Sequence, residues 1–237
     1  MVKFEGLIPA EFLGRDRRFT AFVRVNQGLS RAHIAHTGRL TTVLVPGRQV
    51  WLSEAKNKNR WTHYDLKLVA IDHVMVAIDS RLPNVLFSEA VKQQSLKDFM
   101  YKEIQQEVKL GHSRIDFRLS GPLGTCWVET KSVTLEKDRV ALFPDAPSIR
   151  GRKHLKELTE VLKDSIRAAV VFIVQRPDVD SFSPNQEIDP DFADILTKVA
   201  GTGVEVKAYR CQVGLDEITI DHEIPVILNN TSENFHV

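Results

Sequence analysis

The stretch Ser113-Arg114-Ile115-Asp116-Phe117-Arg118-Leu119 and the run Cys126-Trp127-Val128-Glu129-Thr130-Lys131 both alternate apolar and polar side chains, as β-strands do. The segment Gly121-Pro122-Leu123-Gly124 between them is typical of a hairpin connection. Because neighbouring residues of a strand point to opposite faces, pairing of the two runs would let Asp116, Glu129 and Lys131 converge.

These three side chains suit the chemistry of phosphodiester hydrolysis. Carboxylate oxygens are ligands that Mg²⁺ prefers, and Mn²⁺ can take its place. A metal held by Asp116 and Glu129 would activate water and stabilise charge on a phosphodiester, and Lys131 could orient that water. Exposed cross-strand salt bridges would leave the same residues in the sequence, so both interpretations stay open.

The segment before this hairpin has an apolar residue at every fourth position, at Leu96, Met100, Ile104 and Val108. This spacing predicts a helix that starts with Ser88 as its cap and ends near Gly111. Glu107 would lie on that helix, from where a carboxylate could face the edge of the sheet at Asp116.

The segments after the hairpin predict an α/β domain with a mixed sheet and helices on both faces. Strands are predicted at 132–135, 140–143, 168–175 and 204–211, the third of them buried on both sides. A helix with Leu155, Leu158 and Leu162 precedes it, and a second helix follows the Asp189-Pro190 start signal. The first helix begins with cations, which oppose the helix dipole and favour a bound anion, unless acidic neighbours neutralise them.

The first 80 or so residues have short alternating runs separated by turn residues and predict a small all-β barrel of the OB type. The pattern changes near Arg81, which divides the chain into a barrel domain at 1–83 and an α/β domain at 84–237. Residues 1–83 carry 13 Lys and Arg against 7 Asp and Glu, whereas the rest carries 19 against 24. The basic barrel therefore predicts a polyanionic partner, although a solvated basic face would have the same composition.

Two groups of basic residues on the barrel fit a nucleic acid. Arg15, Arg17 and Arg18 precede Phe19, and a predicted loop combines cations with aromatic rings on which bases could stack. Cys126 and Cys211 lack metal-ligand spacing and are predicted to be buried thiols. The start of the chain is unlike a signal peptide and no apolar run is long enough to span a membrane, so we expect a cytoplasmic protein without membrane contact. The motifs of P-loop, dinucleotide-binding, zinc-protease and serine-hydrolase proteins are absent.

Several blocks of the sequence together resemble the sugar fermentation stimulation protein A family. The blocks that carry the resemblance are Arg17-Arg18-Phe19, His33-Ile34-Ala35-His36-Thr37-Gly38-Arg39-Leu40 with Pro46-Gly47, Gly111-His112-Ser113-Arg114-Ile115-Asp116-Phe117, Trp127-Val128-Glu129-Thr130-Lys131-Ser132-Val133-Thr134-Leu135, Phe143-Pro144-Asp145-Ala146-Pro147, Arg150-Gly151-Arg152-Lys153-His154-Leu155 and Asp189-Pro190-Asp191-Phe192. At His36 the chain departs from the family, where an Asn usually precedes Thr-Gly.

The resemblance implies an OB-like domain followed by a domain similar to PD-(D/E)xK restriction-endonuclease-type nucleases, and it implies DNA binding. Asp116, Glu129 and Lys131 match the nuclease motif, and Glu107 matches the acidic residue of its first helix. The partner that the resemblance implies is DNA, with single- and double-stranded forms both open, and RNA is an alternative. The alternative is a DNA-binding regulator of sugar metabolism, including maltose use, whose nuclease residues do not cut. Nucleic-acid contacts are predicted at Arg15, Arg17, Arg18, Arg39, Lys56, Lys58, Arg60, Trp61, Arg152 and His154.

Overall fold

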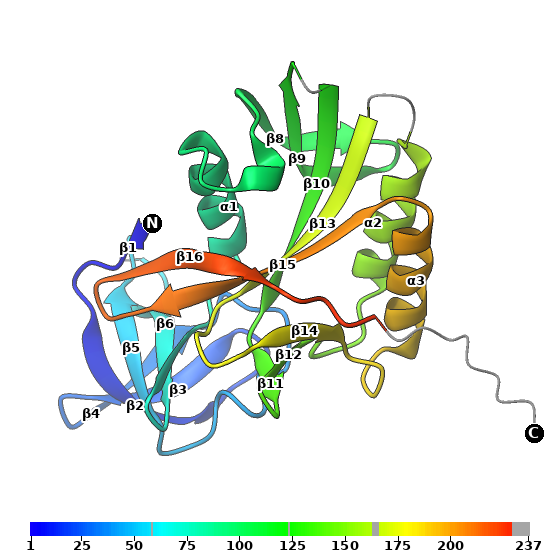
Figure 1. Cartoon of the computed structure of the whole chain (residues 1–237). Helices are drawn as coiled ribbons and strands as arrows, with labels where there is room; N and C mark the ends of the chain where they lie inside the picture. The colour runs from blue at the N-terminus through cyan, green and yellow to red at the C-terminus, as the bar shows by residue number, and fades with distance from the viewer. Residues whose placement is uncertain (58, 123, 163–165, 229–237) are drawn as a thin grey trace, which may run out of the picture.

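The computed structural model describes residues 1–57, 59–122, 124–162 and 166–228. Figure 1 shows a small barrel next to a larger α/β unit. The strand β7 (Val74–Ala77) pairs with the last barrel strand and precedes the first helix of the α/β unit in the chain. This arrangement confirms the predicted fold class.

The barrel contains β2 (Ile8–Arg15), β3 (Thr20–Val25), β4 (Gly28–His33), β5 (Gln49–Glu54) and β6 (Tyr64–Ile71). The strands follow the order β4-β3-β2-β5-β6, and a parallel pairing between β4 and β6 closes the barrel. The alternating apolar residues fill its interior, among them Val23, Val50 and Leu66, so the period of two in the sequence corresponds to the inward face.

The α/β unit is built on a seven-stranded mixed sheet in the order β1-β16-β15-β13-β10-β9-β8. Its strands are β1 (Val2–Lys3), β8 (Glu103–Leu110), β9 (Ser113–Gly121), β10 (Gly124–Val133), β13 (Ile166–Val174), β15 (Glu205–Val213) and β16 (Glu217–Ile224). The predicted hairpin of β9 and β10 is present and antiparallel, whereas β10, β13 and β15 run parallel.

Helices cover both faces of this sheet. The helix α1 (Leu82–Lys92) packs with Phe117 and Val128 on one face. The helices α2 (Ile149–Glu160) and α3 (Pro190–Gly201) pack with the buried strand β13 on the other face. Asp189 caps α3 as expected, because its carboxylate accepts a hydrogen bond from the Phe192 N–H. A small second sheet contains β11 (Leu135–Lys137), β12 (Val140–Phe143) and β14 (Ser181–Pro184).

The single helix predicted from Ser88 to Gly111 is wrong. The helix α1 ends at Lys92, a short 3-10 turn η1 follows at Lys97–Phe99, and residues 103–110 form β8. Ser88 is a buried residue inside α1 and does not cap it. A spacing of four also fits a strand, because it is an even number and leaves Ile104 and Val108 on one side. Pairing with β9 decided between the two, since it gives hydrogen-bond partners to the backbone groups on one side of residues 103–110.

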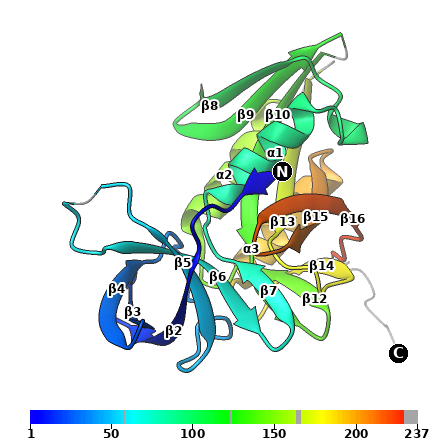
Figure 2. The same ribbon diagram turned by 90° about the vertical axis from the view of Figure 1, so that its left-hand side faces the viewer.

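The first residues of the chain do not belong to the barrel. Figure 2 shows this N-terminal segment running from the barrel to the end of α1, where β1 pairs with β16. The terminal amine forms an ion pair with Glu89 of α1, with 2.7 Å between nitrogen and oxygen. The barrel itself therefore begins at β2, and the range 1–83 includes a strand of the other sheet.

Both thiols are buried, as predicted, and burial raises the pKa of Cys126 to about 12. Within the described ranges, no helix has the length and apolar character needed to cross a membrane.

Candidate active site between the two domains

A cleft of about 700 Å³ lies where the barrel meets the α/β unit. The barrel contributes Arg18, His36, Thr37 and Gly38 to its wall. The α/β unit contributes the residues predicted for catalysis, which are Glu107, Asp116, Glu129 and Lys131. Residues from five elements or loops far apart in the sequence thus enclose one site.

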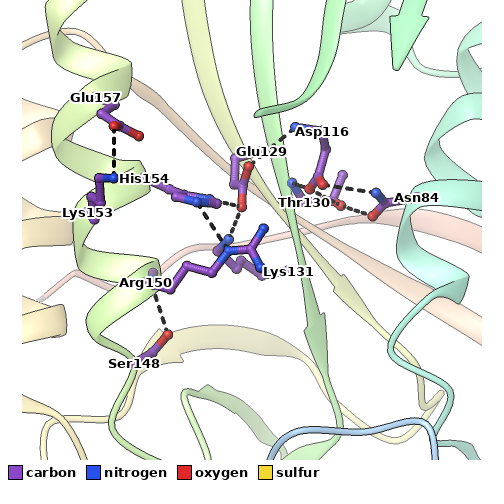
Figure 3. Close-up of polar contacts among 11 residues, drawn as sticks. Asn84, Asp116, Glu129, Thr130, Lys131, Ser148, Arg150, Lys153, His154 and Glu157 are labelled. Carbon is purple, nitrogen blue, oxygen red and sulfur yellow. Dashed lines mark hydrogen bonds and ion pairs between the residues drawn. The ribbon is translucent and has the colours of Figure 1, made fainter. Parts of the chain in front are cut away.

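Asp116 lies on β9 and is held by neutral hydrogen-bond donors. Its Oδ2 accepts from the Thr130 N–H at 2.8 Å and lies 2.9 Å from the Thr130 hydroxyl, and its Oδ1 accepts from the Asn84 amide at 3.0 Å (Figure 3). Asn84 comes from α1, so the helix and the hairpin fix this carboxylate together. Because these partners carry no charge, the negative charge of Asp116 remains available to a cation.

Glu129 lies on the neighbouring strand β10, and its side chain is only 5% exposed. Its Oε1 contacts both the Lys131 ammonium and the His154 Nδ1, while Oε2 lies 3.4 Å from the Asp116 N–H. Burial alone would raise the pKa of this carboxyl, but Lys131 and His154 outweigh burial and lower it to about 2. Glu129 is therefore ionised at neutral pH.

His154 connects Glu129 to Arg150, which lines the cleft. It lies on α2, is 2% exposed, and its Nε2 is 3.3 Å from the Arg150 Nε–H. The tautomer with a proton on Nδ1 satisfies both contacts, because Nδ1 then donates to Glu129 and Nε2 accepts from Arg150. Figure 3 shows His154 and Arg150 reaching from α2 toward the Glu129 and Lys131 pair on β10.

Glu107 reaches the cleft from the strand β8 and not from a helix. Its φ of 53° lies in the left-handed region, and the pairing of β8 with β9 passes directly from Gln106–Phe117 to Val108–Ile115. Such strain in a residue without a glycine's freedom is often found at functional sites. Glu107 lines the same cleft as Asp116, as predicted, but it lies on a strand and not on the predicted helix.

The side chains predicted to contact nucleic acid form two groups. One group is exposed to solvent, and the other is partly or fully buried against protein partners. Arg17, Arg18, Arg39, Lys56 and Trp61 are exposed, and Lys58 lies outside the described residues. Two of the exposed side chains still have protein partners, since Arg18 donates to the Thr37 carbonyl and Trp61 lies under the Arg31 guanidinium.

The remaining four have partners within the protein. Arg15 donates to the carbonyl groups of Arg18, Gly38 and Arg39, and Arg60 binds Asp65 and two carbonyl groups of its own loop. Arg152 pairs with Asp191 and lies 3.5 Å from Asp189 of the α3 cap, and His154 is buried against Glu129. At the start of α2, Arg152 and Lys153 are thus paired with the carboxylates of Asp191 and Glu157, whereas Arg150 contacts His154.

Several residues of the cleft were not predicted as site residues, among them Asn84, Thr130, His36 and Asp145. Asn84 and Thr130 orient Asp116, while His36 and Asp145 lie at the boundary of the domains. His36 is buried, its Nδ1 accepts from the Gly38 N–H at 3.0 Å, and its Nε2 has no hydrogen-bond partner among the described residues. Thr130, His36 and Asp145 lie within the blocks that carry the family resemblance and Asn84 does not, but only the tertiary contacts identify these side chains as part of the cleft.

Asp145 joins the α/β unit to the barrel. Its Oδ2 accepts from the Leu40 N–H at 3.2 Å, and a methyl group added to Gly38 would come within 2.0 Å of its Oδ1. The two blocks around Gly38 and Asp145, far apart in the chain, thus meet at the edge of the cleft.

We expect Gly38→Ala to lower the free energy of unfolding by about 1 kcal/mol, because Asp145 must move and release the Leu40 N–H. Urea titration of the two proteins measures this. Gly14→Ala serves as the control, since nothing lies within 4 Å of a methyl group there. Equal stability of the Gly38 variant and the wild type would show that the contact contributes nothing.

Comparison with known proteins identifies both parts of the chain. Residues 13–78 match the SfsA N-terminal OB domain, and residues 81–217 match the RE domain of the sugar fermentation stimulation protein. A sugar fermentation stimulation protein homolog of Desulforamulus reducens is 43% identical over 94% of this chain and 93% of its own length. The homolog of Caldanaerobacter subterraneus is 40% identical over 94% of this chain and 97% of its own length.

A solved structure has the same architecture. The structure of Pyrococcus furiosus SfsA in complex with Ca²⁺ aligns with a TM-score of 0.89 at 33% identity, covering 95% of this chain and 98% of that chain. With a barrel, an α/β unit and relatives that match nearly end to end, this chain belongs to the sugar fermentation stimulation protein family.

Proposed function

We propose that the protein is a DNA-binding phosphodiester hydrolase that uses a divalent cation, Mg²⁺ or Mn²⁺, in the cleft between its two domains. The observation that carries this proposal is the placement of Asp116, Glu129 and Lys131 together in that cleft, whose lining also includes the exposed Arg18 of the barrel. Two carboxylates and a lysine next to a basic surface suit a phosphodiester better than a neutral substrate.

The carboxylates fit a magnesium site that has only one or two protein ligands. Among the described residues no group of three or more His, Cys, Asp or Glu side chains forms a cation cage. Mg²⁺ commonly uses only one or two protein carboxylates, with waters and substrate oxygens as its other ligands. Oδ1 of Asp116 and Oε2 of Glu129 each face at most one N–H donor, so both keep a lone pair for a cation. The Ca²⁺ in the Pyrococcus furiosus relative supports a divalent cation in the family.

The residues around the carboxylates have separate roles in this proposal. A cation held by Asp116 and Glu129 supplies Lewis-acid stabilisation of the phosphodiester and a water of lowered pKa. Lys131 orients the attacking water and neutralises developing negative charge, and His154 keeps Glu129 in place by donating from Nδ1. Asn84 and Thr130 prevent Asp116 from turning away. Glu107 lines the same cleft from β8 and adds negative charge there.

The barrel holds the nucleic acid in this proposal. Arg17, Arg18 and Arg39 are exposed, and Arg18 lines the cleft itself. Their charges would displace counterions from the phosphates, so affinity should decrease with rising salt.

The test incubates labelled single-stranded DNA, duplex DNA and RNA with the protein in Mg²⁺, in Mn²⁺ and in EDTA. We expect cleavage products with either metal and none in EDTA, and we expect Asp116→Ala to abolish them while DNA binding persists. Absence of products from every substrate in both metals would refute the hydrolase.

Binding without cleavage would favour the second candidate, a DNA-binding regulator of sugar metabolism. One observation favours it, since Lys131 and His154 already occupy Oε1 of Glu129. A site of this kind could keep its residues for folding and binding alone.

A further inference from the structure

The outer face of the barrel carries a line of aromatic and arginine side chains that ends at the cleft. In strands β3 and β4 the residues that point away from the core include Phe22 and Arg31, which are direct cross-strand partners. Arg31 lies over two rings, 5.3 Å from the centre of Phe22 and 4.2 Å from that of Trp61. Trp61 comes from the loop between β5 and β6, so the loop and the sheet face form one surface.

The same face continues toward the other domain. His33 is the cross-strand partner of Thr20, and its ring lies 6.3 Å from that of Phe19. The guanidinium of Arg18 lies 5.5 Å from the Phe19 ring centre, and Arg18 also lines the cleft that contains Asp116 and Glu129. We call the six residues Trp61, Arg31, Phe22, His33, Phe19 and Arg18 the aromatic track.

The track is exposed and positively charged. Trp61 is 55% exposed, Phe19 42% and Phe22 38%, which is unusual for rings in a protein with a well-filled core. No carboxylate of the described residues forms an ion pair with Arg31 or Arg18. Exposed rings next to uncompensated guanidinium groups suit a ligand that has planar faces and negative charge at regular intervals.

We propose that the aromatic track binds single-stranded nucleic acid and leads it into the cleft, which makes an unpaired strand the substrate of the hydrolase. This inference rests on the proposed function and names its substrate class. Bases of a duplex are stacked on one another inside the helix and present only their edges, so the flat faces of Trp61 and Phe22 could not stack on them. Bases of a single strand are free to do so, while its phosphates follow Arg31 and Arg18.

The geometry of the barrel agrees with this assignment. Counting from β2, the strands β3 and β4 are the second and third of the barrel, and Arg18 and Trp61 lie in the loops after the first and the fourth strand. OB-fold proteins bind oligonucleotides on this combination of strands and loops. The track also indicates where a bound strand would lead, because it ends at Arg18, which lines the cleft together with Asp116 and Glu129.

The experiment measures binding in EDTA, so that cleavage plays no part. A fluorescein-labelled 15-nucleotide thymidine strand and a 15-base-pair duplex are titrated by fluorescence anisotropy. We expect the wild type to bind the single strand at least tenfold more tightly than the duplex. Trp61→Ala and Phe22→Ala should each weaken single-strand binding about tenfold, and Trp61→Phe should restore most of the affinity because a ring is kept.

Leu29→Ala is the matched control, since Leu29 is a 79% exposed apolar residue of β4 without a ring. It should bind like the wild type. Stronger binding of the duplex, or wild-type affinity in both aromatic variants, would overturn the track. Cleavage in Mg²⁺ is assayed separately on the same proteins, so a failed track with intact cleavage leaves the hydrolase standing. Track binding without any cleavage refutes the hydrolase alone.

Discussion

The Glu129→Gln variant should lose metal-dependent cleavage by about 10³-fold, because one of the two charges that hold the cation disappears from the site. Glutamine has nearly the same shape, so the packing of β10 is preserved. DNA affinity should stay the same or increase, since the substitution removes a negative charge from a cleft that receives phosphates. Gel-based cleavage assays in Mg²⁺ and anisotropy in EDTA measure the two effects on one preparation.

The substitution also tests the ion pair within the site. The Lys131 side chain is only 12% exposed, and in the variant its charge faces a neutral amide. We expect the free energy of unfolding to decrease by up to about 3 kcal/mol, which circular dichroism in urea would detect. Glu103→Gln is the control, because Glu103 lies on β8 with an exposed side chain and is not among the residues that line the cleft. Full cleavage by the Glu129 variant would exclude Glu129 from the chemistry.

The Asp79→Asn variant should be less stable than the wild type by about 2 kcal/mol at pH 7. Asp79 lies between β7 and α1, where its carboxylate accepts from Lys67 of the barrel at 3.0 Å and from Arg81 at 2.6 Å. Burial opposes its charge, but the hydrogen bonds from Arg81 and the charge of Lys67 lower its pKa from 3.8 to about 2. This carboxylate therefore ties the two domains together.

The pH dependence of that difference follows from the sign of the shift. The pKa of Asp79 is lower in the folded protein than in the unfolded chain, so the stabilisation is complete above about pH 5 and is lost as the pH falls toward 2. Urea titrations from pH 7 to pH 3 should show the difference between wild type and variant decreasing by about half at pH 3. Asp180→Asn, in the exposed pair with Arg139, should change little at any pH. A difference that is independent of pH would show that the carboxylate charge is not its source.

The amino-acid sequence by itself determined the hairpin and the barrel. Alternation at Phe117, Leu119 and Val128 is a local property of each strand, and a buried face can accept only one register. The same alternation placed Asp116 and Glu129 on neighbouring strands, so the centre of the site followed from short-range patterns. The buried run before Gln175 and the cap at Asp189 were equally local signals.

Only the tertiary structure decided the identity of β8 and the surroundings of the carboxylates. A spacing of four residues fits both a helix and a strand, and pairing with β9 made the choice at Ile104 and Val108. Asn84 and His154 reach Asp116 and Glu129 from helices on opposite faces of the sheet. Such contacts depend on how separate segments pack, because the periodicity of a segment specifies which face is buried and not which residues it will meet.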